Sequence, residues 1–448
     1  MVADGAGLEI RGGTVLPLDR RKTLVGSVYV ADAQIVGVGG PPPAGFTAAT
    51  VIDASGCLVL PGLVQAHTHL CQTLCRGAAD DLPLLEWLRE RVWPYEAALD
   101  ERAMRACVRL ALAELIRGGT TAILDMGTVR ESDALAEEIG AGGLRAVFGK
   151  AMMDTGDGVP RGLRESTAAS LAESDALAAR HGHPEVHGGR LGYAYAPRVV
   201  LSCTPQLLAA VGERCRDGAR VHTHASEQLP EVSLVRQLLG DDNIAYLDRL
   251  GIGGPGVALA HCVHPTPAER LLLAARGTHV VHCPSSNLKL GSGIAPIPEL
   301  LELGVSVALG ADGAPCNNNL DGFLELRLAA LLHKPRAGAR AMDAWTTLEL
   351  ATRGGARALG QGDRIGTLEV GRRADLIVVE PRGAHTTPGP DPAGTLVYAA
   401  RSTDVRDVIV DGRILLRRGE LTAASGLDLE EVVARGREEA ARVAARIR

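Results

Sequence analysis

The chain has 448 residues, of which 46% are apolar and only 3% are aromatic. This length exceeds one ordinary core and suits a large barrel with an accessory domain. The net charge is −6, and acidic and basic residues are mixed along the chain, which argues against a nucleic-acid partner or a polybasic membrane surface.

Targeting features and cysteine spacing indicate the cellular compartment of the protein. The N-terminus lacks a basic start followed by an apolar run, so we expect no secretory signal. The most apolar stretches are only as long as strands, so we expect no membrane span. Nine cysteines are scattered without a CxxC pair, as is typical of reduced, buried thiols. We therefore expect a cytoplasmic protein.

The two ends of the chain carry short β-segments broken by Gly and Pro. Alternating runs near the N-terminus predict a small antiparallel sheet, and a similar texture returns near the C-terminus. We expect the two ends to pair into one β-sandwich domain, built from residues 1–59 and 366–425. The Ala/Glu/Arg-rich segment 426–448 predicts a surface helix.

The middle of the chain, residues 60–365, alternates short apolar runs with longer amphipathic stretches. This rhythm is typical of βα units and a parallel sheet. The eight runs are 63–66, 121–125, 145–149, 191–195, 220–223, 257–260, 279–282 and 305–310. They predict an α/β fold, a (β/α)8 TIM-type barrel, with a doubly wound sheet as the alternative.

The two architectures differ in where they place polar residues. A barrel brings polar side chains together from the C-terminal ends of many strands. Here such residues follow four of the runs, and they are His67, His69, His222, His224, Glu227, His261 and Asp312. This distribution favours the barrel and one shared site.

His67 and His69 form the first candidate metal pair. Residues i and i+2 of a strand face the same side, so both imidazoles can bind one ion. An HxH motif alone is weak support, because it also arises as two polar residues at a strand end. The preceding Pro61-Gly62 and the distant His and Asp residues strengthen the metal interpretation.

The fifth run offers a second ligand. Of His222 and His224 we choose His224, because Glu227 follows it by three residues and can reach both a water and the substrate. We interpret His222 as a core or supporting histidine. His261 has two interpretations, a further ligand or a donor to the attacking hydroxide.

Asp312 lies between glycines in Gly310-Ala-Asp-Gly313 and would complete a shell of three His and one carboxylate. Its alternative is an ordinary Asp-Gly turn. The mixed N/O set suits one Zn²⁺, although Fe²⁺ or Mn²⁺ would also fit. The fourth run has no Lys to bridge two ions, and Lys150 lies one strand early, so we expect a single ion.

These residues resemble the amidohydrolase superfamily, and most closely its aminopurine deaminase branch. The likeness covers nearly the whole chain and rests on five segments in particular: Pro61–His69, Leu74–Leu82, Ala260–His264, Ser285–Leu290 and Gly310–Asn319. Residues 366–376 also match the family's entry into its C-terminal sheet.

The resemblance implies a role for each matched residue. It implies metal ligands at His67, His69, His224 and Asp312. It implies a proton-shuttling Glu at Glu227 and a hydroxide-holding His at His261. It also implies that Glu96, after Trp93-Pro-Tyr, binds ribose hydroxyls.

Two positions depart from the methylthioadenosine deaminases of this branch. Arg198 stands where those enzymes have His, and Lys150 stands where they have Arg. Both positions lie where the family grips its substrate, so we expect Arg198 and Lys150 to contact substrate. A guanidinium offers rigid paired donors that an imidazole cannot match.

The sequence thus predicts a metal-dependent hydrolase that releases ammonia from a purine nucleoside. We expect Asp312 to take a proton from the attacking water, His261 to orient it, and Glu227 to protonate the ring nitrogen. Deamination of a free base such as guanine or 8-oxoguanine, triazine hydrolysis, and a non-catalytic scaffold are the alternatives. We also expect a homo-oligomer.

Overall fold

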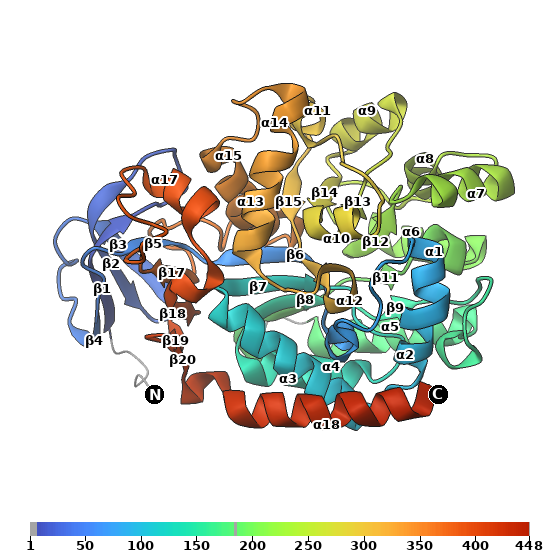
Figure 1. Cartoon of the computed structure of the whole chain (residues 1–448), viewed down its shortest axis with the longest axis horizontal. Helices are drawn as coiled ribbons and strands as arrows, with labels where there is room; N and C mark the ends of the chain where they lie inside the picture. The colour runs from blue at the N-terminus through green and yellow to red at the C-terminus, as the bar shows by residue number, and fades with distance from the viewer. Residues whose placement is uncertain (1–6, 183–185, 448) are drawn as a thin grey trace.

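The computed structural model describes residues 7–182 and 186–447. Figure 1 shows a strand-rich part on the left and a larger part on the right, in which helices surround strands. The left-hand part combines the blue beginning of the chain with orange and red segments from its end. Both ends therefore build one sheet, as the sequence predicts.

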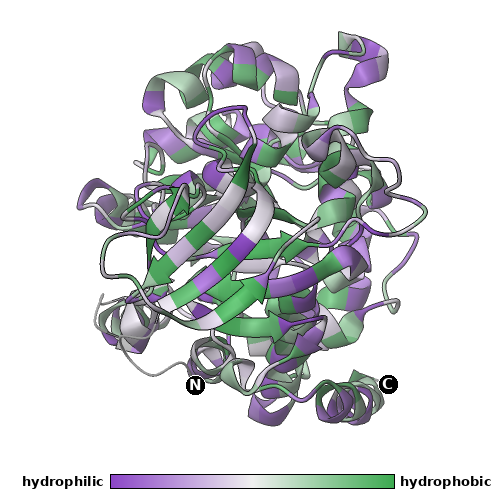
Figure 2. Ribbon diagram, turned by 90° about the vertical axis from the view of Figure 1, so that its left-hand side faces the viewer, coloured by the Kyte–Doolittle hydropathy of each residue, from purple (hydrophilic) through white to green (hydrophobic). Residues whose placement is uncertain are grey.

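This terminal sheet has nine strands, in the order β20-β19-β18-β17-β5-β1-β2-β3, with β4 paired to β1. Figure 2 views the molecule from the side on which this sheet lies. The first five strands of the chain are β1 (Gly7–Val15), β2 (Leu24–Ala31), β3 (Gln34–Gly39), β4 (Ala48–Asp53) and β5 (Leu58–Pro61). The remaining four are β17 (Leu376–Val379), β18 (Val405–Val410), β19 (Arg413–Arg417) and β20 (Glu420–Leu421). Along β1, buried Leu8 and Ile10 alternate with the more exposed Glu9 and Arg11.

The predicted antiparallel arrangement of this sheet is only partly right. Most neighbours are antiparallel, including β5 and β17, which join the two ends of the chain. However, β1 runs parallel to both β4 and β5. Alternating burial identifies a strand but carries no information on its direction, and the chain crosses over between β3 and β4 instead of making another hairpin.

The larger part contains parallel strands, one for each predicted run. They are β6 (Leu63–His69), β7 (Thr120–Asp125), β8 (Arg145–Phe148), β10 (Leu191–Tyr193), β12 (Val221–Ala225), β13 (Val257–His261), β14 (His279–His282) and β15 (Val307–Leu309). They pair as β10-β8-β7-β6-β16 and as β12-β13-β14-β15, where β16 is Asp312–Gly313. The short strands β9 (Ala151–Met152) and β11 (Ala196–Pro197) pair separately. The fold class is therefore α/β with parallel strands.

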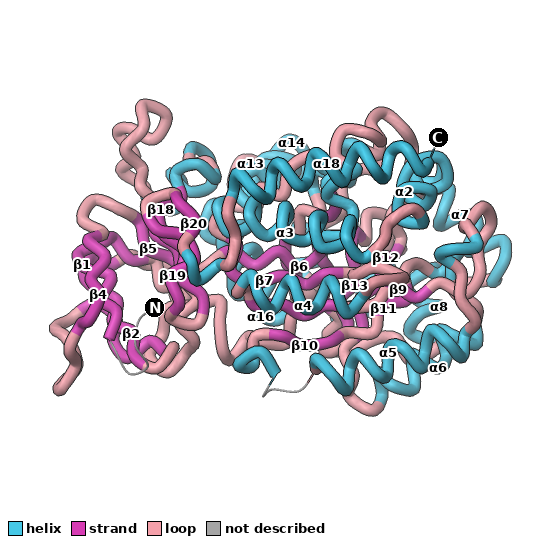
Figure 3. Tube along the Cα trace, turned by 90° about the horizontal axis from the view of Figure 1, so that it is seen from below, coloured by secondary structure: helices cyan, strands magenta, loops and turns pink. Residues whose placement is uncertain are grey.

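Helices connect these strands and cover them from outside (Figure 3). The longer ones are α3 (Glu101–Arg117), α4 (Ser132–Gly142), α5 (Thr167–His181), α6 (Pro205–Arg216), α7 (Leu229–Leu239), α9 (Pro267–Arg276), α13 (Gly322–Leu332) and α18 (Leu429–Ile447). The shorter ones are α1 (Leu84–Trp87), α2 (Trp93–Ala97), α8 (Asn243–Arg249), α10 (Pro284–Lys289), α11 (Ile297–Glu302), α12 (Ala314–Asn317), α14 (Lys334–Ala337), α15 (Ala344–Glu349), α16 (Gly355–Ala358) and α17 (Pro392–Gly394). The predicted C-terminal helix α18 packs along α3. Among the described residues, no helix is both long and apolar enough to cross a bilayer.

Candidate active site

The predicted ligands meet at the C-terminal ends of the parallel strands. His67 and His69 end β6, and His224 lies near the end of β12. Asp312 begins β16, which pairs with β6 so that Asp312 lies opposite Thr68. The sequence separates these residues by more than two hundred positions, and strand pairing brings them together.

A chain of hydrogen bonds fixes the tautomer of His67. The Nδ1 atom of His222 lies 3.0 Å from the carbonyl oxygen of Ala258, which can only accept, so this nitrogen carries the hydrogen. The bare Nε2 of His222 then accepts from Nδ1 of His67 at 2.7 Å. The Nε2 atom of His67 is left with a free lone pair, as a metal ligand requires.

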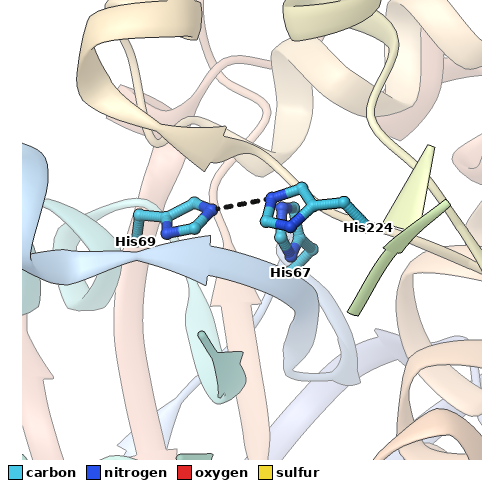
Figure 4. Close-up of side chains that lie close together, drawn as sticks. All are labelled: His67, His69 and His224. Carbon is cyan, nitrogen blue, oxygen red and sulfur yellow. Dashed lines mark hydrogen bonds between the residues drawn. The ribbon is translucent and has the colours of Figure 1, made fainter. Parts of the chain in front are cut away.

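His224 is held in the same way by a different carbonyl. Its Nδ1 atom donates to the backbone oxygen of Arg198 at 2.6 Å, so its Nε2 is bare. That Nε2 faces Nε2 of His69 at 3.2 Å, as Figure 4 shows together with the nearby His67. Two facing nitrogens, one without a hydrogen, suit a shared cation.

Asp312 adds an anion to this group of nitrogens. Its Oδ1 lies 3.3 Å from Nε2 of His67 and 3.5 Å from Nε2 of His69. Its other oxygen accepts from the hydroxyl of Ser286 at 2.6 Å. Burial alone would raise the pKa of Asp312, but the surrounding imidazoles, His67 first, hold it well below its usual range. The carboxylate is therefore ionised, as a metal ligand would have to be.

Glycine on each side of Asp312 permits this close packing. A Cβ atom on Gly310 would lie 2.9 Å from the backbone of His67, and one on Gly313 would lie 2.2 Å from Oε1 of Gln72. At Gly310 the contact is with backbone, so no side chain fits there, whereas at Gly313 the side chain of Gln72 would have to move. The reason for glycine at Gly310 is therefore steric.

The donor set fits a divalent metal ion. Atoms of His67, His69 and His224 lie within 4.8 Å of one another, and so do atoms of His67, His261 and Asp312. The Nε2 atoms of His67 and His261 are buried and have no hydrogen-bond partner. Burial also lowers the pKa values of His67, His69 and His224, which keeps their imidazoles neutral and available as ligands.

His261 and Glu227 lie beside this group of donors. The Nδ1 atom of His261 pairs with Oδ1 of Asn287 at 2.9 Å, which leaves its Nε2 bare. That Nε2 lies 3.6 Å from Oε2 of Glu227 and 3.8 Å from Oδ2 of Asp312. His261 is therefore placed between the candidate acid and the candidate ligand.

Glu227 has the environment of a carboxylic acid that holds its proton. Burial raises its pKa well above the usual range, and the charges of Asp312 and Glu231 raise it further. Its position is fixed by Glu231, whose Oε2 accepts from the backbone N–H of Glu227 at 2.8 Å and of Gln228 at 3.3 Å. Such a carboxyl is suited to give a proton and take it back.

Four residues at or beside these strand ends have a left-handed backbone conformation. Ser226, His261, Cys262 and Asp312 are non-glycine residues with φ between 43° and 70°. Each conformation is costly and is maintained by its surroundings, and such positions cluster at functional sites. These positions lie just after β12, at the end of β13 and at the start of β16.

A pocket opens from this centre to the surface. Its inner wall consists of polar residues: His69, Gln72, Arg198, His224, Glu227, Glu231, His261 and Asp312. Its outer wall is mostly apolar, with leucines and tryptophans from α1, from the following turn and from α7. The polar groups thus lie at the bottom of a pocket whose entrance is apolar.

Comparison with known proteins places this site in a family. Residues 58–415 match the amidohydrolase family. The chain belongs to the amidohydrolase family. A curated relative from Syntrophobacter fumaroxidans, a 5-methylthioadenosine/S-adenosylhomocysteine deaminase, is 42% identical over 98% of each chain.

Two further relatives have related names. The 5'-deoxyadenosine deaminase of Methanothermobacter thermautotrophicus is 41% identical and is aligned over 88% of this chain and 90% of its own. The crystal structure of an adenosine deaminase from Xanthomonas campestris, with bound zinc, has a TM-score of 0.91 and 36% identity. That comparison covers 98% of this chain and 99% of the other.

Of the substrate-binding residues expected for this amidohydrolase, Glu96 and Lys150 do not line the pocket. Glu96 is behind Arg198, and its carboxylate accepts from both terminal nitrogens of that guanidinium and from Nε2 of Gln72 at 2.8 Å. Arg198 itself lines the pocket, and its contact with substrate stays a prediction.

The structure does not bring Lys150 to the site. Its ammonium donates to the carbonyl of Val129 and forms ion pairs with Glu165 at 2.8 Å and Glu173 at 3.3 Å. Lys150 lies in the break between β8 and β9, and there its side chain is fully buried beside α5. Lys150 therefore does not line the pocket, in contrast to the position that the sequence led us to expect.

Sequence reasoning overlooked the residues that hold the ligands in place. Asn287 contacts the side chain of His261, Ser286 contacts that of Asp312, and Glu231 accepts from the backbone N–H of Glu227. His222 supports His67, as expected. Asn287 and Ser286 lie in the Ser285–Leu290 segment that the family shares. The resemblance in that segment could have pointed to Asn287 and Ser286 as residues of the site.

Proposed function

We propose that this amidohydrolase is a zinc-dependent hydrolytic deaminase, which converts an adenosine-type nucleoside to the inosine analogue and releases ammonia. Substrates of this class are 5'-deoxyadenosine, methylthioadenosine and S-adenosylhomocysteine. The names of the relatives at 41–42% identity support the reaction class. The observation that carries the proposal is the buried Glu227 carboxyl beside a set of bare imidazole nitrogens.

The expected metal ligands are His67, His69, His224 and Asp312, and we propose one ion. When bound, zinc supplies the Lewis acidity that makes water a nucleophile near neutral pH. Fe²⁺ or Mn²⁺ would suit the same mixed N/O set. The donor set is compact enough for one ion, because the candidate atoms all lie within 4.8 Å in each group.

The side chains divide the proton transfers between them. Asp312 accepts a proton from the attacking water, and Nε2 of His261 orients that water. Glu227 donates its proton to the ring nitrogen next to the amino group, which makes the adjacent carbon electrophilic. After the water oxygen has attacked that carbon, a proton reaches the amino group and ammonia leaves. The raised pKa of Glu227 supports its role as the acid.

Arg198 is the proposed substrate-binding residue on the pocket wall, and Glu96 acts with it. Arg198 is buried and lines the pocket, and Glu96 holds its guanidinium in place. We propose that the free donors of Arg198 contact acceptor atoms of the nucleoside. This arrangement is rigid, because the carboxylate binds the guanidinium at two points.

We propose that the parallel strands form a closed (β/α)8 barrel over residues 60–365. Three features support closure: β16 pairs with β6, β15 leads directly into β16, and a bridge joins Tyr195 to Val221. We further propose that the terminal sheet folds over as a β-sandwich from residues 1–59 and 366–425, followed by the helix in 426–448. A homo-oligomeric state and a cytoplasmic location stay predictions.

The test of the function is Glu227→Gln. We expect ammonia release from 5'-deoxyadenosine or methylthioadenosine to fall about 10³-fold, while zinc content measured by elemental analysis stays unchanged. Glu299→Gln, which alters an exposed carboxylate paired with Arg336, is the control and should retain full activity. Turnover of guanine or 8-oxoguanine with no turnover of nucleosides would contradict the proposal, and so would near-normal activity of Glu227→Gln.

A further inference from the structure

The outer half of the active-site pocket is built almost entirely from apolar side chains. The residues are Leu84, Leu85, Trp87, Leu88, Trp93, Leu201, Leu234, Leu238 and Leu290. They come from several segments, of which α1 and α7 both lie at the right-hand end of the molecule in Figure 1. Leu238 is 62% exposed although it lines the pocket, so apolar surface remains open at the entrance. An apolar patch of this kind at a binding site is suited to an apolar part of a ligand.

Two charged residues at the entrance form an exposed ion pair with each other. Arg89 donates to Asp157 at 2.8 Å, and their side chains are 43% and 90% exposed. Apart from this pair, the charged groups that line the pocket are at its inner end, around the candidate metal ligands. The outer half therefore offers no unpaired charge to a ligand among the residues described.

The proposed chemistry sets the direction of the substrate. The amino-bearing ring must lie at the inner end, where Glu227 and His261 are located, so the sugar and its 5' substituent extend outward. A zwitterionic amino-acid tail would have to give up water for a leucine-lined wall, at a cost that no partner there offsets. A thioether or alkyl tail would gain by the same transfer.

On the basis of the proposed function, we infer that the substrate carries an apolar 5' substituent, a thioether or alkyl group, which the leucines at the entrance bind. Leu84, Leu88 and Leu238 are then residues that determine specificity. An amino-acid tail, as in S-adenosylhomocysteine, is disfavoured. The base and the sugar bind at the inner wall, so the apolar outer half acts on the 5' group alone.

The first experiment compares substrates on the zinc-loaded enzyme. We expect kcat/KM for methylthioadenosine to exceed that for 5'-deoxyadenosine, and to exceed that for S-adenosylhomocysteine by about 10-fold or more. Leu238→Ser should lower kcat/KM for methylthioadenosine several-fold and leave 5'-deoxyadenosine unchanged. The matched control is Leu271→Ser, an equally exposed leucine on α9 (60%) that does not line the pocket, and it should change neither.

A preference for S-adenosylhomocysteine would contradict the inference. If S-adenosylhomocysteine is the better substrate and Arg89→Ala selectively weakens it, the ion pair opens to hold the zwitterion and the inference is wrong. Calorimetry on Glu227→Gln measures the affinity for each of these ligands. It therefore separates the preference for a tail in binding from any effect on the reaction. Tight binding of methylthioadenosine without deamination by the wild type would remove the proposed function and keep the tail preference. Equal affinity for all tails would remove the preference alone.

Discussion

The guanidinium of Arg198 binds the carboxylate of Glu96 at two points, with Nη2 and Oε1 2.9 Å apart, and both side chains are buried. The backbone oxygen of Arg198 meanwhile anchors His224. One residue thus connects a buried ion pair, the pocket wall and a candidate metal ligand. Arg198 and Glu96 are 102 positions apart in the sequence, and the fold brings them into contact.

This ion pair predicts a strongly non-additive result. Glu96→Gln and Arg198→Met should each destabilise the protein by about 3–5 kcal/mol, because each leaves a buried charge unpaired. The double variant should lose much less than the sum, since neither charge remains. Urea unfolding of the four proteins, monitored by circular dichroism, measures the coupling. Additive losses would mean that the two side chains do not interact in solution.

The imidazole behind His67 predicts an effect on metal affinity. His222→Phe removes the acceptor that fixes the tautomer of His67, so zinc affinity should fall about 10- to 100-fold with the fold intact. Competition with a chromophoric chelator measures the affinity. His279→Gln is the matched control, because His279 is also buried but bonds to Pro255 away from the site. Unchanged zinc affinity of His222→Phe would exclude the supporting role.

Arg145 links the parallel strand β8 to the terminal sheet. Its guanidinium is fully buried and pairs with Asp375 at 2.7 Å and with Asp411 at 2.8 Å. Arg145→Met should therefore lower the free energy of unfolding by about 3–5 kcal/mol. Arg336→Met breaks an exposed pair with Glu299 and should cost less than about 1 kcal/mol. Comparable losses for both variants in denaturant titrations would refute this ranking.

Glu325 predicts a pH-dependent contribution to stability. Burial raises its pKa to about 7, although Ser285 and Asn317 donate to it. Folding therefore favours the protonated form, and this contribution is present at acidic pH and is lost as the pH rises through about 7. Between pH 5 and pH 8, wild type should lose roughly 2–3 kcal/mol relative to Glu325→Gln, at about 1.4 kcal/mol per pH unit. A difference that does not vary with pH would show an ordinary pKa.

The sequence was most informative where a local pattern determines the structure. Each of the eight apolar runs became a parallel strand, and the polar residues at their ends converged because parallel strands all point the same way. The pairing of the two ends of the chain in one sheet was also predicted, because both ends contain short alternating β-segments.

The sequence was least informative where side chains meet across long separations. Glu96 and Arg198 each looked available to a substrate, because no local pattern shows that two charges will neutralise each other. Lys150 follows a strand, but the break between β8 and β9 directs its side chain to Glu165 instead of the pocket. Asn287 lies in a short helix, and nothing in the local sequence shows that its side chain contacts His261.

The pairing of β5 with β17 has a consequence for biosynthesis. While the chain emerges from the ribosome, β5 has no partner on one side until β17 (Leu376–Val379), near the C-terminal end of the chain, has been made. An unpaired strand edge invites association with other nascent chains. A stop codon shortly before Leu376 would leave that edge open permanently, so C-terminal truncation should cause aggregation even though every residue around the metal ligands is still encoded.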